Sequence, residues 1–196
     1  LLNPFEVIQY DQKNFSEEDI ENITLLKQKG YHVISVLYNG RPLILNDILD
    51  SDAIVEAWFL GSSAAESLAE LLVGIVNFSG KLTTSFPRHE GQIPLYYNHL
   101  STGRPYDKEH FNQYTSFYMD CENTPLFPFG YGLNYSTFRY DHLHVSKTDV
   151  DETDMLDVFV DVTNTSTIDG YEIIQLYIHD VKAGIARPLK ELKKYQ

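Results

Sequence analysis

The sequence predicts a mixed α/β protein, with a layered α/β sandwich domain over residues 1–140 and a truncated all-β sandwich over residues 141–196. Two observations predict this fold class. Helix-like and strand-like segments alternate with short connections in the first part of the chain, which is typical of layered α/β domains. From Tyr140 onward, apolar residues recur at every second position, which is the period of strands with one buried face.

A first helix is expected to begin after Ser16. The serine hydroxyl is a favoured N-cap, and Glu17, Glu18 and Asp19 place negative charge at the positive end of the helix dipole. Apolar residues then recur at helical spacing until Gly30 ends the element. Residues 32–38 form a short β-branched run that predicts a buried strand.

A second strand is expected over residues 53–59, and a second helix over residues 62–73. Four residues of that helix recur at helical spacing and are expected to face inward: Ala65, Leu68, Ala69 and Leu72. Residues 86–140 lack clean periodicity, yet they hold 14 of the 26 aromatic residues and five of the eight prolines. Long irregular stretches tend to be functional. The alternative is that these rings only fill an irregular layer.

Three segments beyond Tyr140 alternate like sandwich strands: residues 143–145, 157–162 and 173–178. A sandwich of the immunoglobulin or fibronectin kind needs about seven strands and about 100 residues. Only 56 residues follow Tyr140, so this second domain is expected to be incomplete. The chain also begins without Met and ends without a terminating element, so we expect it to be a piece of a longer protein.

The composition argues against several classes of partner. Asp and Glu number 28 against 15 Lys and Arg, for a formal net charge of −13. Nucleic acids and anionic membrane surfaces are held by clustered Lys and Arg, so neither is expected as a partner. No apolar run approaches the ~20 residues of a membrane span.

The sequence also argues against metal and cofactor sites. Cys121 is the single cysteine, which excludes a disulfide framework and any multi-Cys zinc site. His142 and His144 would share one strand face, but no third ligand follows at a suitable spacing. Residues 130–135 begin like a dinucleotide fingerprint, yet they lack its third glycine and precede a strand. No metal and no cofactor are therefore expected.

The linear order of six motifs resembles the C-terminal α/β domain of glycoside hydrolase family 3, and most of all that of the bacterial β-glucosidases of the three-domain type. The tail beyond Asp161 resembles the start of that family's fibronectin type III-like domain. The motifs are Asn39-Gly40-Arg41-Pro42, Asp52 to Gly61, Asn77 to Arg88, Gly91 to Tyr97, Thr102 to Tyr106 and Phe127 to Tyr135.

The resemblance implies a retaining glycosidase that uses no metal or cofactor. Such enzymes place a carboxylate nucleophile and a carboxylic acid/base at ~5 Å around the glycosidic bond. In the family, the nucleophile is an Asp of an N-terminal TIM barrel, which this sequence lacks. We therefore expect a fragment of a β-glucosidase or β-xylosidase that is inactive alone. Its expected partners are that missing barrel and a β-linked oligosaccharide or aryl glucoside.

Four residues are candidates for the site that the resemblance implies. Counting back from residues 39–42, Glu6 lies where the family places its acid/base. The residues around Glu6 lack the family's Ser-Gly-Glu-x-x-Ser-Arg pattern, so a plain solvent-exposed acid is the other interpretation. Arg104 and Tyr114 are expected to bind the leaving-group sugar through a guanidinium donor fork and an apolar ring face. Trp58 is expected either to border the sugar site or to lie in the core.

Two other functions stay open on the sequence alone. The aromatic stretch from Phe86 to Tyr140 is compatible with a non-catalytic carbohydrate-binding or interaction module of the same fold. A remnant without independent activity, its open sandwich edge prone to pairing with other chains, is the third possibility.

Overall fold

The computed structural model describes residues 8–9 and 15–196. The chain divides into two compact units, each assembled from separate segments. The first comprises residues 1–64, 82–131 and 175–195, and the second residues 65–81 and 132–174 with residue 196. The secondary structure is mixed α/β, as predicted. The predicted boundary between residues 140 and 141 stays a prediction.

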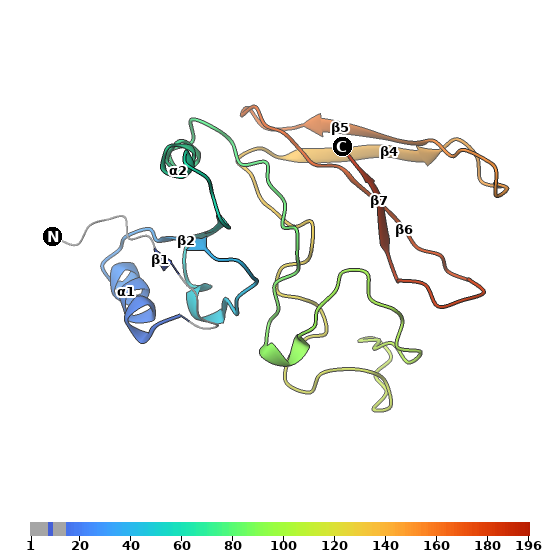
Figure 1. Cartoon of the computed structure of the whole chain (residues 1–196), viewed down its shortest axis with the longest axis horizontal. Helices are drawn as coiled ribbons and strands as arrows, with labels where there is room; N and C mark the ends of the chain where they lie inside the picture. Colours follow the sequence, from blue (N-terminus) through green and yellow to red (C-terminus); the bar gives the residue numbers. More distant parts are fainter. Residues whose placement is uncertain (1–7, 10–14) are drawn as a thin grey trace. The chain divides into compact units, whose positions relative to one another are not determined.

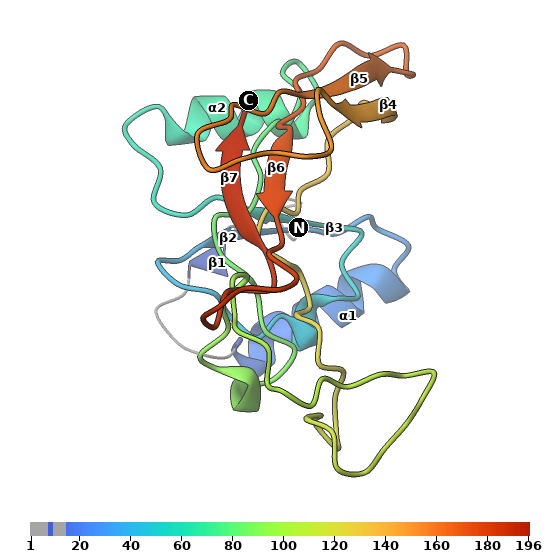
Figure 2. The same cartoon turned by 90° about the vertical axis from the view of Figure 1, so that its right-hand side faces the viewer.

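A parallel three-stranded sheet in the order β1-β2-β3 organises the first unit. Its strands are β1 (Ile8–Gln9), β2 (Ile34–Tyr38) and β3 (Ala53–Glu56), and helix α1 (Glu17–Gln28) connects β1 to β2. Figure 2 shows α1 on one side of this sheet. The predicted strand over residues 53–59 stops at Glu56, because Trp58 has a φ of 50°, which is incompatible with extended backbone.

The core of the first unit joins the helix, the sheet and the irregular segments. Its central residues are Ile23 of α1, Leu37 of β2, Ile48 of the short helix η1 (Asn46–Ile48) and Phe86. Ile48 and Phe86 are 0% and 1% exposed. The irregular stretch from residue 86 thus begins in the core, and a further short helix, η2 (Glu90–Gln92), follows soon after.

Helix α1 begins as its sequence predicts. The Ser16 hydroxyl accepts a hydrogen bond from the backbone N–H of Asp19 at 3.2 Å and donates to the Asp19 carboxylate. At the other end of the helix, Lys27 lies 2.9 Å from a carboxylate oxygen of Asp52, just before β3. The Lys27 hydrogen bond, helped by the backbone N–H of Val33, lowers the pKa of Asp52 to about 2.

Replacing Ser16 by alanine should lower the free energy of unfolding by about 1 kcal/mol, because an orphan N–H of the first turn loses its acceptor. Chemical denaturation followed by circular dichroism measures the change. Ser16→Thr keeps a capping hydroxyl and is the matched control. An equal loss in both variants would contradict the assigned cap.

Helix α2 (Ala64–Leu72) buries less than its sequence pattern predicts. Leu68 is buried and Leu72 is half-buried, whereas Ala65 and Ala69 are exposed. The prediction of four inward residues was therefore wrong for the two alanines. Helical spacing identifies an apolar face, but only a packed neighbour can bury that face.

An antiparallel pair, β4 (Phe138–Val145) and β5 (Val158–Asn164), runs through the second unit (Figure 1). The register shifts between Asp141 and His144, and His142 in this bulge has a φ of 53°. Nδ1 of His142 lies 2.8 Å from a carboxylate oxygen of Asp161, and the His144 ring stacks on Phe159. These histidines thus contribute to a sheet surface.

The side chain of Asn77 links distant segments of the second unit. Its Nδ2 donates to Oγ of Ser136 at 2.7 Å and to the carbonyl of Asp169 at 2.9 Å. Its Oδ1 accepts from the backbone N–H of Tyr135 at 2.8 Å. Gly170 is required beside this network, since a Cβ there would lie 2.5 Å from Oγ of Ser136. The motif residue Asn77 therefore has a structural function here.

A second antiparallel pair, β6 (Gln175–Ile178) and β7 (Glu191–Tyr195), belongs to the first unit. The Tyr177 ring lies edge-on to Tyr97 at 6.1 Å between centroids, and Tyr97 stacks on Phe129 at 4.3 Å. Gly130, with a φ of 80°, leaves room for the amide of Gln175. This pair therefore packs on the irregular aromatic stretch.

Candidate functional site

The carboxyl ends of β2 and β3 form the first candidate region. Since both strands run parallel, their ends lie at one edge of the sheet, where ligands bind in open α/β sheets. Asn39 directly follows β2, and Glu56 is the last residue of β3. Asn39 is 2% exposed, and its Nδ2 donates to the carbonyl of Arg41 at 2.7 Å.

Trp58 lies beside this edge and is half-buried. Its backbone N–H donates to Oε1 of Glu56 at 2.9 Å, which holds the residue in its left-handed conformation. The Trp58 ring packs against Phe86 at 5.9 Å between centroids and contacts the core of the first unit. The indole therefore has a core contact as well as an exposed part, and its contact with sugar stays a prediction.

Glu56 is the strongly perturbed acid of this region. Burial raises the pKa of its carboxyl from 4.5 to about 7, although the hydrogen bond from the Trp58 backbone and the nearby Asn39 amide act in the opposite direction. Glu56 is not among the site residues predicted from the sequence. The available signal was a single acid at the end of an apolar strand, Ala53-Ile54-Val55-Glu56-Ala57.

Arg104 and Tyr114 lie on an irregular loop of the first unit. The carbonyl of Arg104 accepts from the backbone N–H of Ser116 at 2.8 Å, and Pro105 and Ser116 form a parallel bridge. This pairing brings the two arms of the loop together, so both candidates belong to one local structure. Arg104 is exposed, and the Tyr114 side chain is 69% exposed.

An aromatic cluster stabilises the same loop from within. Phe117 lies 5.6 Å from Tyr106 and 5.4 Å from Phe111 between ring centroids. Asp107 and His110 form a further contact at 2.8 Å, and the hydrogen bond from His110 lowers the pKa of Asp107. The loop therefore has internal packing, which leaves Arg104 and Tyr114 available at its surface.

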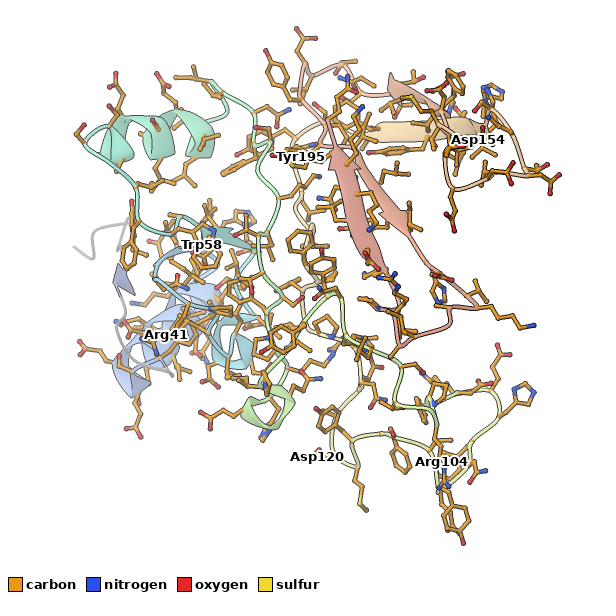
Figure 3. All side chains as sticks on the ribbon, turned by 45° about the vertical axis from the view of Figure 1, so that its right-hand side comes forward. Arg41, Trp58, Arg104, Asp120, Asp154 and Tyr195 are labelled. Carbon is orange, nitrogen blue, oxygen red and sulfur yellow. The ribbon has the colours of Figure 1, made fainter. Side chains whose placement is uncertain are left out.

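The structure does not bring all the predicted site residues together. Figure 3 shows Arg104 well away from Trp58, with the two residues on different parts of the first unit. Glu6 lies outside the described residues. Among the residues described, no group of three or more His, Cys, Asp or Glu side chains is arranged to hold a metal ion. No helix in the described ranges is long and apolar enough to cross a membrane.

Most of the chain matches the model of one protein family. Residues 7–135 match the model of the glycosyl hydrolase family 3 C-terminal domain. The chain belongs to glycosyl hydrolase family 3. Its family membership confirms the resemblance predicted from the six ordered motifs.

Several family 3 proteins are similar to this chain over most of its length. The periplasmic β-glucosidase of Salmonella typhimurium is 46% identical over 182 residues, which are 92% of this chain. A β-xylosidase of Formosa agariphila is 38% identical over 177 residues. Among solved structures, a β-glucosidase from Listeria innocua in complex with isofagomine aligns with a TM-score of 0.86 and 42% identity over 94% of this chain.

The chain is much shorter than these family 3 relatives. It covers 24% of the Salmonella and Formosa proteins, and 26% of the Listeria chain. It thus spans about a quarter of the length of the relatives it matches. What those whole proteins do comes to this chain only as a proposal.

Proposed function

We propose that this chain is the C-terminal part of a retaining β-glucosidase or β-xylosidase that hydrolyses terminal non-reducing β-D-glycosidic bonds. The observation that carries the proposal is the similarity to proteins named β-glucosidase and β-xylosidase along nine-tenths of the chain. The Listeria β-glucosidase has been solved with glucose and with laminaribiose, which indicates the class of ligand. No metal or cofactor takes part in the proposed reaction.

The proposed chemistry divides between this chain and a barrel domain. Retaining hydrolysis needs a nucleophilic carboxylate and a second carboxyl group that first protonates the leaving oxygen and then activates water. The nucleophile belongs to the N-terminal barrel, and Glu6 is the proposed acid/base. Arg104 and Tyr114 are proposed to hold the leaving-group sugar or aryl group, and Trp58 to border the sugar site.

We also propose that this chain has the domain organisation of the family. Residues 1–140 form the layered α/β sandwich domain of the family, and residues 141–196 the start of a fibronectin type III-like sandwich. The antiparallel pairs β4–β5 and β6–β7 support this proposal, because antiparallel pairs are the building units of such sandwiches.

The isolated chain should not hydrolyse p-nitrophenyl β-glucoside or p-nitrophenyl β-xyloside above the buffer rate, because it holds at most one of the two catalytic carboxyl groups. Release of p-nitrophenol at 405 nm measures the activity. A Glu6→Gln variant, prepared in parallel, is the control for contaminating enzyme. A contaminant would release p-nitrophenol at the same rate in both preparations. Turnover that depends on Glu6 would contradict the assignment of the nucleophile to the barrel.

A second candidate function is a carbohydrate-binding module without catalysis, and the exposed rings of the Arg104 loop favour it. Phe111 and Tyr114 are 63% and 69% exposed, and exposed rings offer apolar faces to sugars. Titration calorimetry with cello-oligosaccharides separates the two functions. Half of a catalytic cleft should give no heat, whereas a module should give heat that Tyr114→Ala abolishes.

A further inference from the structure

Two buried oxygen atoms at the carboxyl edge of the sheet have no hydrogen-bond partner among the described residues. They are Oδ1 of Asn39 and Oε2 of Glu56. The other polar atoms of both side chains are used. Oε1 of Glu56 accepts from the Trp58 N–H, and Nδ2 of Asn39 donates to the Arg41 carbonyl. Buried polar atoms are nearly always paired, so these two need an explanation.

A proton on the Glu56 carboxyl group would give both unpaired oxygen atoms a partner. An ionised carboxylate has only acceptors, and the amide oxygen of Asn39 is an acceptor as well. Glu56 of β3 is registered with Leu37 of β2, so the side chains of Glu56 and of Asn39, two residues beyond Leu37, lie on the same face of the sheet at its carboxyl edge. A proton on Oε2 turns this oxygen into a donor, so that a single hydrogen bond satisfies both atoms.

We propose that Glu56 is neutral in the folded protein, and that its Oε2–H donates to Oδ1 of Asn39. This hydrogen bond, which we call the proton latch, joins the segment after β2 to the segment after β3. Its function is to position Trp58, whose backbone N–H is held by the other oxygen of the same carboxyl group. The proton latch is independent of the proposed hydrolase function.

The two segments are also in direct contact beside the proton latch. A Cβ on Gly40 would lie 2.7 Å from the ring of Phe59, so the ring lies directly against the Gly40 backbone. Trp58, between Glu56 and Phe59, has a φ of 50°, a conformation that non-glycine residues keep only when their surroundings impose it. Loss of the proton leaves two acceptor oxygens facing each other, and this repulsion should move the segment of Trp58 and Phe59 away from the segment of Asn39 and Gly40.

The electrostatic environment agrees with a neutral carboxyl group. Burial raises the pKa of Glu56 to about 7, and it outweighs the hydrogen bonds that stabilise the ionised form. Tyr38 at the end of β2 and the exposed Arg41 are the titratable residues of the adjoining segment, and neither is among the groups that set this pKa.

The proton latch makes the stability of the chain depend on pH. The pKa of Glu56 is 4.5 in an unfolded chain and about 7 in the folded protein. Between these values the folded state binds one proton more than the unfolded state, so stability falls as the pH rises. The contribution is complete below about pH 4.5 and is lost once the pH passes about 7.

Trp58 is the single tryptophan of the chain, so its fluorescence reports on the proton latch directly. A titration of the 196-residue chain from pH 5 to pH 9 should show a spectral step with a midpoint near 7. Glu56→Gln should abolish the step and keep the low-pH spectrum throughout, because its amide donates to Asn39 while its oxygen accepts from Trp58. Glu66→Gln, an exposed acid of α2, is the matched control and should keep the step.

A second variant tests the identity of the partner. Asn39→Asp places a carboxyl group opposite Glu56, and two acids that share one proton hold it to higher pH. The midpoint should move up by at least one pH unit, a tenfold change in proton affinity. A wild-type chain without a step, a step that survives in Glu56→Gln, or a midpoint unmoved by Asn39→Asp would each overturn the proton latch.

Discussion

Replacing Phe86 by alanine should remove about 3–5 kcal/mol from the free energy of unfolding, the largest loss that we expect from any single substitution. The Phe86 side chain is 1% exposed and packs against Trp58. Its backbone pairs with Phe127, with the Phe86 N–H donating to the Phe127 carbonyl at 2.8 Å. The packed surroundings therefore cannot collapse fully into the cavity, and the loss includes a cavity cost as well as a transfer cost.

Guanidinium denaturation followed by circular dichroism measures this loss, and Phe111→Ala is the matched control. Phe111 is 63% exposed and its contact with Phe117 is a single edge-to-face pair, so its removal should cost about 1 kcal/mol. Equal losses for the two variants would show that Phe86 does not belong to the cooperative core.

Replacing Lys81 by methionine should cost about 2–4 kcal/mol of stability at neutral pH. Nζ of Lys81 lies 3.0 Å from a carboxylate oxygen of Glu172, and each side chain is only 13% exposed. The same Nζ donates to the Gly132 carbonyl at 2.8 Å. Methionine matches the length of lysine but leaves the Glu172 charge unpaired in a largely desolvated place, and that desolvation is the main cost.

The exposed pair of the same unit provides the control for Lys81. Lys147 and Asp154 lie 2.7 Å apart with side chains 42% and 33% exposed, so Lys147→Met should cost less than about 1 kcal/mol. Adding Glu172→Gln to Lys81→Met should restore part of the lost stability by removing the unpaired charge. Thermal unfolding of the three variants measures these losses. Similar losses of stability for Lys81→Met and Lys147→Met would contradict the desolvation of the Lys81–Glu172 pair.

The elements of this protein were predictable where their signals are local. Ser16 caps α1 with the hydrogen bond that its position before three acids predicts. Within the β-branched run at residues 32–38, Ile34–Tyr38 form β2. A cap and a strand depend on residues within one turn or one strand length, so a short window of sequence contains the necessary information.

The predictions failed where a distant residue decides the outcome. The expected strand over residues 53–59 ends early at the left-handed conformation of Trp58, whose ring packs against the distant Phe86. Ala65 and Ala69 are exposed because an apolar helix face is buried only by a packed neighbour. Glu56, the acid with the raised pKa, could not be predicted from the sequence because its burial comes from the fold around it.

The sequence by itself determined the family of this protein, because ordered motifs along one chain identify a family without any knowledge of their positions in space. It also determined the starts of α1 and β3, which depend on neighbouring residues. Only the tertiary structure decided which polar groups lose their water: Glu56 beside Asn39, and Lys81 beside Glu172. Desolvation depends on every atom that surrounds a group, and the chain assembles those atoms from segments far apart in the sequence.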